Sequence, residues 1–452
     1  MVTVVNVALD EPREVLATTQ TLSLSSQSAS HIQLWQEKVR GGFAALPIVF
    51  ASAHGHTVTD VDGKKYIDMI TQFAVLNFGH GHPKIVEAVV EQTRKLSLVN
   101  TSFINPLYAK LADRITKKFG YDSIAAMLSG SEAVDSAIKI SRKWAYVKKG
   151  IPADEALILT TDRCYHGINL TVMPLSNRMA ENFGKHLPNV GPFSPIDGRL
   201  IRYGSSEDLE EVLEQCGTKV AAFLVEPIQG YAGTRIPPDG YLRRVQDICQ
   251  KHNVLVICDE IQTGFGRTGR DLAYQHELGV KPDLVLLGKG LTGGVTPLSL
   301  VMGKKHVMDI LAPGEVANTY AASPPACAAA LAVLDILEED QISARAQRLG
   351  RIMSNAIQEA QLPHLLEHRG KGRGLFQTLV IDESADGLVT ARRIAALCAV
   401  RGVLVGNGSN RVRLSPPLTI SETALLKAVN VIASAFRDVG ALGDFAGSEY
   451  LN

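Results

Sequence analysis

Asp283-Leu-Val-Leu-Leu-Gly-Lys-Gly290 is the stretch of this sequence that decides the fold, because it places a charged amine directly after a run of aliphatic residues. Lysine is rarely buried without a partner or a function. Burial lowers the pKa of an amine and makes it a nucleophile that forms Schiff bases with carbonyl compounds. A surface lysine at the end of a strand is the alternative, and Lys289 alone would favour it. The residues upstream decide against that alternative.

Two further apolar runs, at 220–225 and 254–258, are similar to the one at 283–287. Continuous apolar runs are typical of strands that are buried on both faces of a parallel sheet. Residues 240–251 have helical spacing between two of these runs, so strand, helix and strand form a right-handed crossover unit. A further helix is expected at 131–147. The sequence therefore predicts an α/β fold with a mostly parallel sheet between helices.

Each of the three predicted strands ends in a functional group: Glu226, Asp259 and Lys289. Ligands of open parallel sheets bind at the carboxyl ends of the strands, so these side chains are expected to meet in one cleft. Pyridoxal phosphate would fit this set, because it needs a lysine for a Schiff base and a carboxylate that keeps its ring nitrogen protonated. Asp259 is the candidate carboxylate, although a helix N-cap is an alternative. Gln262 is a candidate donor to the phenolic oxygen of the ring.

Two segments are candidates for holding the phosphate and the ring of such a cofactor. Ser129-Gly-Ser-Glu-Ala133 opens a predicted helix, where backbone N–H groups and the helix dipole would face an anion. An ordinary helix cap is the alternative for this Ser-Gly pair. Tyr165-His166-Gly167 is a candidate stacking platform for a planar ring, although an aromatic residue in such a loop is more often part of the core.

Two glycine motifs suggest a nucleotide, and neither fits well. Gly264-Phe-Gly-Arg-Thr-Gly269 has the dinucleotide spacing, but polar residues separate it from the strand and no apolar helix begins at its third glycine. Gly288-Lys289-Gly290 lacks the spacing and the Ser or Thr of a phosphate-binding loop. Nucleotide binding is therefore disfavoured.

The strand-end residues and the Ser-Gly turn, together with the stretches quoted at the end of this paragraph, make the chain similar to the class III pyridoxal-phosphate aminotransferases of fold type I. The similarity runs from about residue 43 to residue 437. Within that class the chain most resembles the ornithine aminotransferases, at 143–150, 191–193 and 369–372. The stretches that carry the class resemblance are Asn77-Phe-Gly-His-Gly-His-Pro83, Ser129-Gly-Ser-Glu-Ala133, Val225-Glu-Pro-Ile-Gln-Gly230, Asp259-Glu-Ile-Gln-Thr-Gly-Phe-Gly-Arg-Thr-Gly269, Leu287-Gly-Lys-Gly290, Asn318-Thr-Tyr320 and Val412-Arg-Leu-Ser-Pro-Pro417.

The resemblance implies a role for each matching residue. Lys289 would carry the Schiff base and move the proton between substrate and cofactor, and Asp259 would hold the protonated ring nitrogen; these two are the expected catalytic residues. Thr319 would reach the phosphate from the partner subunit, because the family's sites lie at a homodimer interface. Arg413 matches the arginine that binds the α-carboxylate of glutamate or 2-oxoglutarate, a pairing that suits a bidentate guanidinium. The expected cofactor contacts are Gly130, Ser131, Tyr165, His166, Glu226, Asp259, Ile261, Gln262, Lys289 and Thr319.

Four positions depart from the ornithine aminotransferases and set the expected substrate. Those enzymes have tyrosines at Phe43 and Phe73, an arginine at Ile168 and a glutamate at Tyr231. These polar groups hold the charged ends of ornithine. A pocket without them would leave a zwitterionic tail unpaired, so it discriminates against such a substrate. With Arg413, these four are the expected substrate contacts, and they predict an apolar or aromatic amine donor rather than ornithine.

Composition sets the remaining limits. The chain has 452 residues with 46 basic and 46 acidic side chains, so its charge gives no reason to expect nucleic acid or an anionic membrane as a partner. Its six cysteines are scattered without metal-ligand spacing, which favours free thiols in a reducing compartment and predicts no metal. Residues 1–31 contain acidic and Ser/Thr-rich stretches rather than a targeting pattern, so they are expected to form a flexible arm of a cytoplasmic protein.

The expected architecture is a large cofactor-binding domain at 76–333, with a small α+β domain built from 32–75 and 334–452. The expected function is transfer of an amino group from a primary amine or amino acid to a 2-keto acid such as 2-oxoglutarate or pyruvate. Racemisation, epimerisation or decarboxylation with the same fold and cofactor is the first alternative, because one fold hosts several chemistries. A non-catalytic scaffold is the second, and the retained lysine and carboxylates disfavour it.

Overall fold

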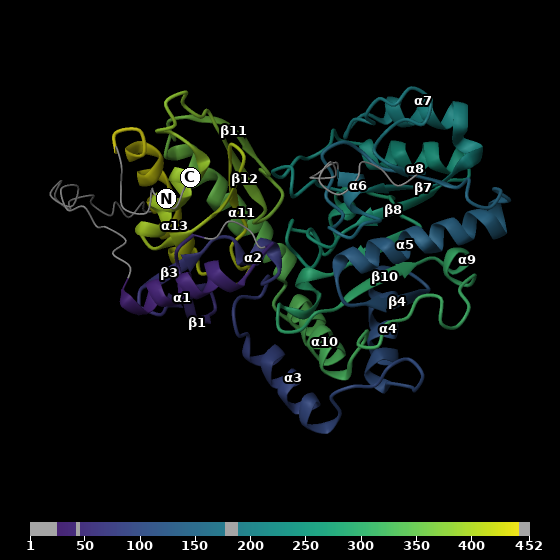
Figure 1. The fold of residues 1–452 in the computed structure, drawn as a ribbon, viewed down its shortest axis with the longest axis horizontal. Helices are drawn as coiled ribbons and strands as arrows, with labels where there is room; N and C mark the ends of the chain where they lie inside the picture. Colours follow the sequence, from purple (N-terminus) through teal and green to yellow (C-terminus); the bar gives the residue numbers. More distant parts are fainter. Residues whose placement is uncertain (1–24, 42–45, 177–188, 443–452) are drawn as a thin grey trace, which may run out of the picture.

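The computed structural model describes residues 25–41, 46–176 and 189–442 and arranges them in two lobes (Figure 1). The larger lobe is built on a seven-stranded, mostly parallel sheet, and the smaller lobe holds two four-stranded sheets. This architecture confirms the α/β fold class predicted from the sequence. Among the described helices, none combines the length and the apolar character that crossing a membrane requires.

The strands of the large sheet lie in the order β4-β10-β9-β8-β7-β5-β6. Strand β10 pairs antiparallel with β4 and β9, and the other neighbours are parallel. The three apolar runs of the sequence form β7, β8 and β9 at the centre, where every residue is buried. The bounds are β4 Ser123–Met127, β5 Leu157–Leu159, β6 Val190–Gly191, β7 Val220–Val225, β8 Leu255–Asp259, β9 Leu284–Leu287 and β10 Ser299–Gly303.

Alternate residues of the central strands point to opposite faces of the sheet, and each face has its own hydrophobic core. Leu224 and Ile257 pack into the core that α5 covers. Phe223 and Val256 pack into the core that includes α8 and α10. This two-sided burial explains why the strands read as continuous apolar runs. The helices of this lobe are α3 Pro83–Lys95, α4 Pro106–Phe119, α5 Gly130–Trp144, α6 Met173–Ser176, α7 Ser206–Cys216, α8 Tyr241–Lys251, α9 Lys305–Met308 and α10 Pro324–Glu339.

The small lobe combines the two ends of the chain. Strand β13 from the C-terminal part pairs parallel with β3 from the N-terminal part, as expected for a lobe built from both segments. Its sheets are β1-β2-β3-β13 and β11-β12-β15-β14. The bounds are α1 Ser26–Lys38, β1 Phe50–His54, β2 Thr57–Asp60, β3 Lys65–Asp68, α2 Thr71–Ala74, α11 Ile342–Glu359, β11 Leu365–Arg369, β12 Gln377–Ile381, α12 Ala391–Val400, β13 Val403–Leu404, β14 Gly406–Gly408, β15 Arg411–Leu414 and α13 Glu422–Asp438.

The boundaries of the elements differ in places from those predicted. The helix expected at 131–147 is α5, which ends at Trp144 and continues as a π-helical turn over Ala145–Lys149. Helix α1 begins inside the stretch expected to be an arm, whose residues 1–24 lie outside the described residues. Helix α10 runs across the boundary proposed at residue 333, so the domain limits remain a prediction.

The segment α2 is a left-handed turn without a glycine, so the sequence does not predict it. Thr71, Gln72, Phe73 and Ala74 have φ values of 47°, 50°, 64° and 67°. Only glycine adopts such values without cost, so this turn is held by its surroundings. The Asp68 carboxylate accepts hydrogen bonds from the backbone N–H groups of residues 70 and 71 at 2.9 and 2.8 Å. The turn places the carbonyl of Phe73 next to the active site.

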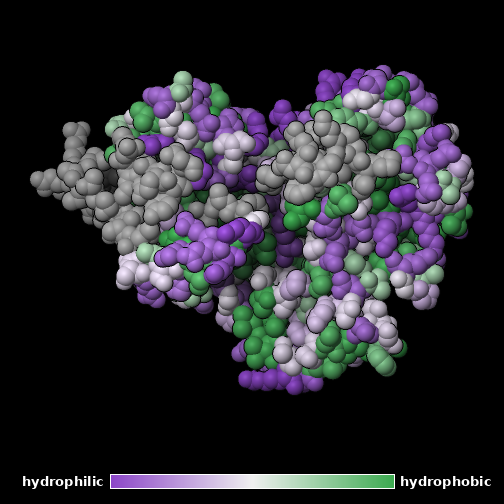
Figure 2. All heavy atoms as spheres, in the orientation of Figure 1, coloured by the Kyte–Doolittle hydropathy of each residue, from purple (hydrophilic) through white to green (hydrophobic). Residues whose placement is uncertain are grey.

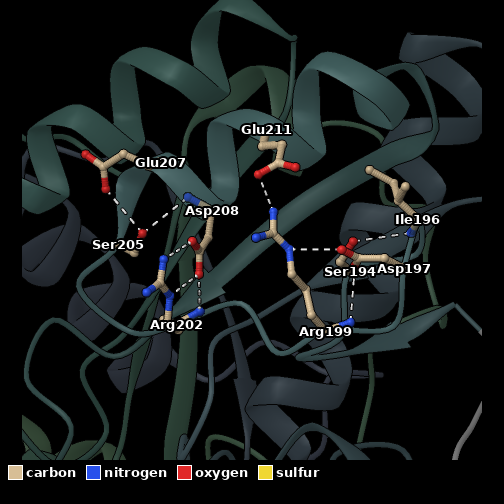
Figure 3. Close-up of polar contacts among 9 residues, drawn as sticks. All are labelled: Ser194, Ile196, Asp197, Arg199, Arg202, Ser205, Glu207, Asp208 and Glu211. Carbon is tan, nitrogen blue, oxygen red and sulfur yellow. Dashed lines mark hydrogen bonds and ion pairs between the residues drawn. The ribbon is translucent and has the colours of Figure 1, made fainter.

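The N-terminus of α7 is fixed by a polar cluster that includes Arg202, Ser205 and Asp208 (Figure 3). The Ser205 hydroxyl accepts a hydrogen bond from the Asp208 backbone N–H, and the Arg202 guanidinium donates to the buried Asp208 carboxylate at 2.7 and 2.9 Å. The next residue, Tyr203, donates its hydroxyl to the carbonyl of Pro227 at 3.0 Å. The cluster therefore helps to hold the loop that follows β7.

Candidate active site

A hollow of about 400 Å³ lies at the carboxyl ends of β7, β8 and β9. Glu226 follows β7, Asp259 ends β8 and Lys289 lies just beyond β9, and all three line the hollow. Parallel strands bring their ends to one edge, which explains why these three groups meet. Of the other predicted cofactor contacts, the hollow is lined by Gly130, Ser131, Tyr165, His166, Ile261 and Gln262.

Lys289 has the backbone and the surroundings of a reactive amine. Its φ of 42° lies in the left-handed region, an arrangement that costs about 1–3 kcal/mol and clusters at functional sites. Loss of solvation lowers the pKa of the Lys289 amine, while Asp259 and Glu226 oppose that shift and Arg413 adds to it. The fold therefore holds this lysine in a form that gives up its proton more readily than an exposed lysine.

Asp259 is held by His166. The two side chains are almost fully buried, and Nδ1 of His166 lies 2.7 Å from Oδ2 of Asp259. A carboxylate only accepts, so Nδ1 carries the hydrogen. Burial alone would lower the pKa of His166, but Cys164 and the bond to Asp259 hold that pKa well above its usual value. In this structure His166 therefore positions and stabilises the Asp259 carboxylate.

Glu226 is the second buried acid of the site. Burial raises its pKa to about 7, with Asp259 acting in the same direction and His166 against it. Its Oε2 accepts a hydrogen bond from the backbone N–H of Tyr165 at 3.1 Å. Glu226 thus ties the loop that carries Tyr165 to the end of β7, next to Lys289.

The N-terminus of α5 forms an anion seat on one side of the hollow. Ser129 and Glu132 form a capping box, which leaves the N–H groups of Gly130 and Ser131 without helical partners. Gly167 lies against this turn with φ of 125°, and a Cβ there would lie 2.2 Å from the Ser131 hydroxyl. Only glycine permits this approach. The loop at 165–167 and the helix N-terminus therefore enclose one small volume, which suits a phosphate.

Aromatic and aliphatic groups bound the hollow on its sides. The ring of Tyr165 stacks on that of Tyr231, with ring centroids 5.1 Å apart and an interplanar angle of 28°. The guanidinium of Arg413 lies 5.4 Å from the centroid of the Tyr231 ring. Ile261 lines the hollow and packs so closely that a Cβ on Gly130 would lie 3.1 Å from its side chain. The walls are thus suited to a flat ring.

Comparison with protein families identifies the class. The family described as "Aminotransferase class-III" matches residues 41–436. The chain belongs to the class III aminotransferases. The match covers both lobes and every predicted site residue, and it accords with the Lys289, Asp259 and α5 geometry described above.

Individual relatives share the whole fold of this class III aminotransferase. An ornithine aminotransferase from Emericella nidulans is 41% identical over 92% of this chain and 93% of its own length. A structure of ornithine aminotransferase from Toxoplasma gondii, with partial occupancy of PLP at its active site, is 34% identical with a TM-score of 0.86 and covers 96% and 99% of the two chains. A thermostable (S)-enantioselective omega-transaminase from Thermomicrobium roseum is 29% identical with a TM-score of 0.82 and covers 91% and 98%.

The cofactor of class III aminotransferases is pyridoxal 5′-phosphate, and this site fits it. The N-terminus of α5 would offer N–H groups to the phosphate, Tyr165 and Ile261 would lie beside the ring, and Lys289 lines the same hollow as the carboxylates Asp259 and Glu226. When bound, the cofactor supplies an electron-withdrawing ring and a carbonyl carbon for the lysine. The fit rests on the donor set and shape of this chain.

Several predicted residues do not line the hollow in the described part of the chain. Gln262 lines it, but one of its amide N–H groups donates to the carbonyl of Phe73 at 3.1 Å. Ile168 is 71% exposed, and Thr319 lies exposed in a turn beyond the hollow. Phe73, Tyr231 and Arg413 are not among the residues that line the hollow. Phe43 lies outside the described residues.

Some lining residues were missed in the sequence. Val75, Ile228 and Leu298 add apolar surface to the hollow. They are scattered single residues of ordinary type, so no spacing distinguishes them from core. Ile228 had one usable signal, because it lies inside the Glu-Pro-Ile-Gln-Gly stretch that follows β7.

Proposed function

We propose that this PLP-dependent class III aminotransferase takes its amino group from a primary amine or amino acid with an apolar or aromatic portion, and not from ornithine. The acceptor is a 2-keto acid such as 2-oxoglutarate or pyruvate. The observation that supports the donor class is the array Tyr165–Tyr231–Arg413, in which the two rings stack and the guanidinium lies 5.4 Å from the centroid of the Tyr231 ring. The array offers aromatic surface where ornithine aminotransferases carry a glutamate.

The donor follows from hydrogen-bonding capacity. Ornithine carries a charged group at each end, and a buried charge without a partner costs several kcal/mol. At Phe73 and Tyr231 this chain offers rings in place of the hydroxyl and the carboxylate. An aromatic donor would instead gain stacking on these rings, an interaction that contributes about 0.5–1.5 kcal/mol. Binding energy at this wall therefore favours apolar donors.

The acceptor follows from Arg413. Its guanidinium lies close enough to Lys289 to lower the pKa of that amine, so a group bound between them lies near the reacting lysine. An arginine binds a carboxylate through two parallel hydrogen bonds, which fixes its orientation. We assign the α-carboxylate of the keto acid to this residue.

The roles of the remaining groups follow from their contacts. The Lys289 amine, with its lowered pKa, is the base and acid for the proton at the substrate carbon. Asp259, held by His166, keeps a proton on the ring nitrogen of the cofactor. Tyr165 and Ile261 fix the plane of the ring. These assignments extend the class-level activity to individual side chains.

The proposal is tested by a donor screen with purified holoenzyme. Each half-reaction is followed by the loss of cofactor absorbance with ornithine, an apolar amino acid or an aromatic amine as donor. We expect the apolar or aromatic donors to react faster than ornithine. Two of the relatives described above are ornithine aminotransferases, so ornithine is the competing donor. Ornithine as the best donor by a wide margin would overturn the proposal.

Two controls separate chemistry from donor choice. Lys289→Ala removes the amine and should abolish the half-reaction with every donor while the fold remains. Tyr231→Phe retains the ring and should preserve the donor order, whereas Tyr231→Glu should shift the order toward ornithine. A Lys289→Ala protein with normal turnover would contradict the catalytic assignment, whatever the donor.

We also propose a cytoplasmic homodimer whose sites include the partner's residues. In the single chain, the side chains of Phe103 and Ile104 are 75% and 91% exposed. Large apolar side chains exposed side by side are typical of a surface that another protein covers. Figure 2 shows hydrophobic residues gathered over the lower part of the molecule, where Figure 1 places α3, α4 and α10. Exposed Thr319 suits a contact across that interface. The mass in solution, measured by light scattering, tests the dimer.

A further inference from the structure

Two glycine-rich segments that do not line the active site meet at the boundary between the lobes. One is the stretch 264–269 of the large lobe, and the other is the turn 369–374 that precedes β12. A Cβ on Gly374 would lie 2.7 Å from the backbone nitrogen of Gly269. A Cβ on Gly350 of α11 would lie 2.1 Å from the carbonyl oxygen of Gly374. Glycine is needed at these contacts because backbone packs directly on backbone.

These segments border a hollow of about 770 Å³ that is separate from the active site. Its volume is in the range of pockets that bind small molecules, roughly 300–1,000 Å³. Arg270 and His276 line it from the large lobe, Gln347 and Arg351 from α11, and Arg373 from the glycine-rich turn. The hollow therefore has walls from both lobes and three guanidinium groups around it.

The arginines of this hollow are largely without anionic partners. Within the described ranges of the chain, the side chains of Arg270 and Arg351 have neither a hydrogen bond nor an ion pair. Arg373 lies 3.9 Å from Asp239, whose side chain is fully exposed, so this pair contributes little. The balance of charge at the hollow thus remains positive.

The acid in the lining does not change that balance. Asp271 already pairs with Lys118 at 2.9 Å and accepts a hydrogen bond from the Ser343 hydroxyl at 2.5 Å. No other carboxylate lines the hollow within the described residues. The lining is therefore cationic overall, and its one carboxylate is satisfied elsewhere.

His276 lines the hollow together with Arg270 and Arg373. Its Nε2 lies 3.1 Å from the carbonyl oxygen of Thr268. Burial, Arg373 and Arg270 together lower the pKa of His276 to about 4, against the effect of the hydrogen bond to Thr268. Two arginines from different lobes thus lie near one imidazole, and all three side chains line the same hollow.

We propose that this hollow binds a small molecule that carries several phosphate groups. Guanidinium groups bind phosphate oxygens through paired hydrogen bonds, and Arg270, Arg351 and Arg373 supply three such groups. The hollow is much larger than one phosphate, so it takes an anion with charges spread over several groups. Because the walls come from both lobes, the bound anion holds the lobes together and stabilises the folded chain.

The test is calorimetric titration of the holoenzyme with sodium tripolyphosphate. The holoenzyme is used because its phosphate seat at α5 is already filled. We expect saturable binding, and a rise in melting temperature with tripolyphosphate. Removing a charged hydrogen-bond partner typically weakens binding by about tenfold or more, so Arg351→Ala and Arg373→Ala should each show such a loss. Arg270→Ala, from the other lobe, should show the same loss.

Arg348→Ala is the matched control. Arg348 is on the same helix as Arg351, but it pairs with Glu422 at 2.9 Å and does not line the hollow. It should bind tripolyphosphate like the unchanged protein. Cofactor absorbance and melting temperature without ligand show whether a variant is folded, and three variants on two lobes cover the case in which one is not.

Three results would overturn the proposal: no saturable binding at millimolar tripolyphosphate, an equal loss in Arg348→Ala, or tighter binding of citrate than of tripolyphosphate. Adenosine triphosphate that binds like tripolyphosphate supports recognition of the phosphates alone. The site does not depend on the proposed amine donor. A failed donor screen therefore leaves this inference intact, and a failed titration leaves the donor proposal intact.

Discussion

The hydrogen bond between His166 and Asp259 gives the sharpest prediction about catalysis. The perturbation is His166→Leu, which fills a similar space and removes the donor at Nδ1. Asp259 is 5% exposed, so water does not replace the lost partner. A hydrogen bond to a charged group contributes about 1.5–3 kcal/mol. The buried Asp259 carboxylate loses about that much stabilisation in His166→Leu.

The size of the effect follows from the role of Asp259. A carboxylate without this partner is not held in place against the ring nitrogen, so it stabilises the proton there less and the rate falls. A change of about 1.4 kcal/mol is tenfold in an equilibrium constant. We therefore expect the half-reaction of His166→Leu to be about 10- to 100-fold slower. The assay is stopped-flow absorbance with saturating donor and a cofactor titration alongside.

The controls separate the hydrogen bond from the volume of the ring. His166→Asn places an amide N–H close to the position of Nδ1 and should recover most of the rate. Thr160→Val removes the hydroxyl 3.2 Å from Nε2 of His166 and should change the rate little. A His166→Leu enzyme with full activity would refute the reasoning. So would His166→Asn being as slow as His166→Leu.

Three further predictions concern stability and the cofactor seat. Burial raises the pKa of Glu226 to about 7, against 4.5 in the unfolded chain. The unfolded chain therefore releases this proton first, and stability is lost as pH rises between these two values. Glu226→Gln should reduce the fall in melting temperature of the cofactor-free protein between about pH 5 and about pH 8. The Arg202 guanidinium holds the pKa of Asp208 below its usual range, so Asp208 stabilises the fold above the unfolded pKa and loses that effect as pH falls. Asp208→Asn should lower the free energy of unfolding by about 1–3 kcal/mol near neutral pH. In acid denaturation series, the difference in stability between the variant and the unchanged protein should vanish. Gly167→Ala would place a Cβ 2.2 Å from a hydroxyl at the N-terminus of α5 and should weaken cofactor binding in an absorbance titration, whereas Gly198→Ala, also at positive φ but in open space, should not.

Local sequence predicts the chemical centre of this enzyme well. The runs that became β7, β8 and β9 are apolar at every position because both faces of the sheet are covered. Once the strands are recognised as parallel, their ends must share one edge. Glu226, Asp259 and Lys289 therefore converge for topological reasons.

Contacts between distant segments escape the same reasoning. His166 bonds a residue 93 positions away, and nothing next to His166 in the sequence shows which partner it has. The left-handed turn at Thr71–Ala74 contains no glycine, so its conformation is imposed by Asp68 and the packed loops around it. Such features depend on the assembled lobes.

The same distinction explains why family membership predicts the cofactor better than the donor. Asp259 is almost fully buried, and together with Lys289 it follows a central strand, so replacing either leaves a buried partner unsatisfied. Tyr231 is only partly buried, and its loop is held through main-chain atoms. The backbone carbonyl of Ala232 accepts a hydrogen bond from the Arg411 guanidinium at 2.7 Å. The side chain at 231 can change while the loop stays in place. We propose on this ground that the chain, 41% identical to an ornithine aminotransferase, keeps the chemistry and differs at the wall that selects the amine.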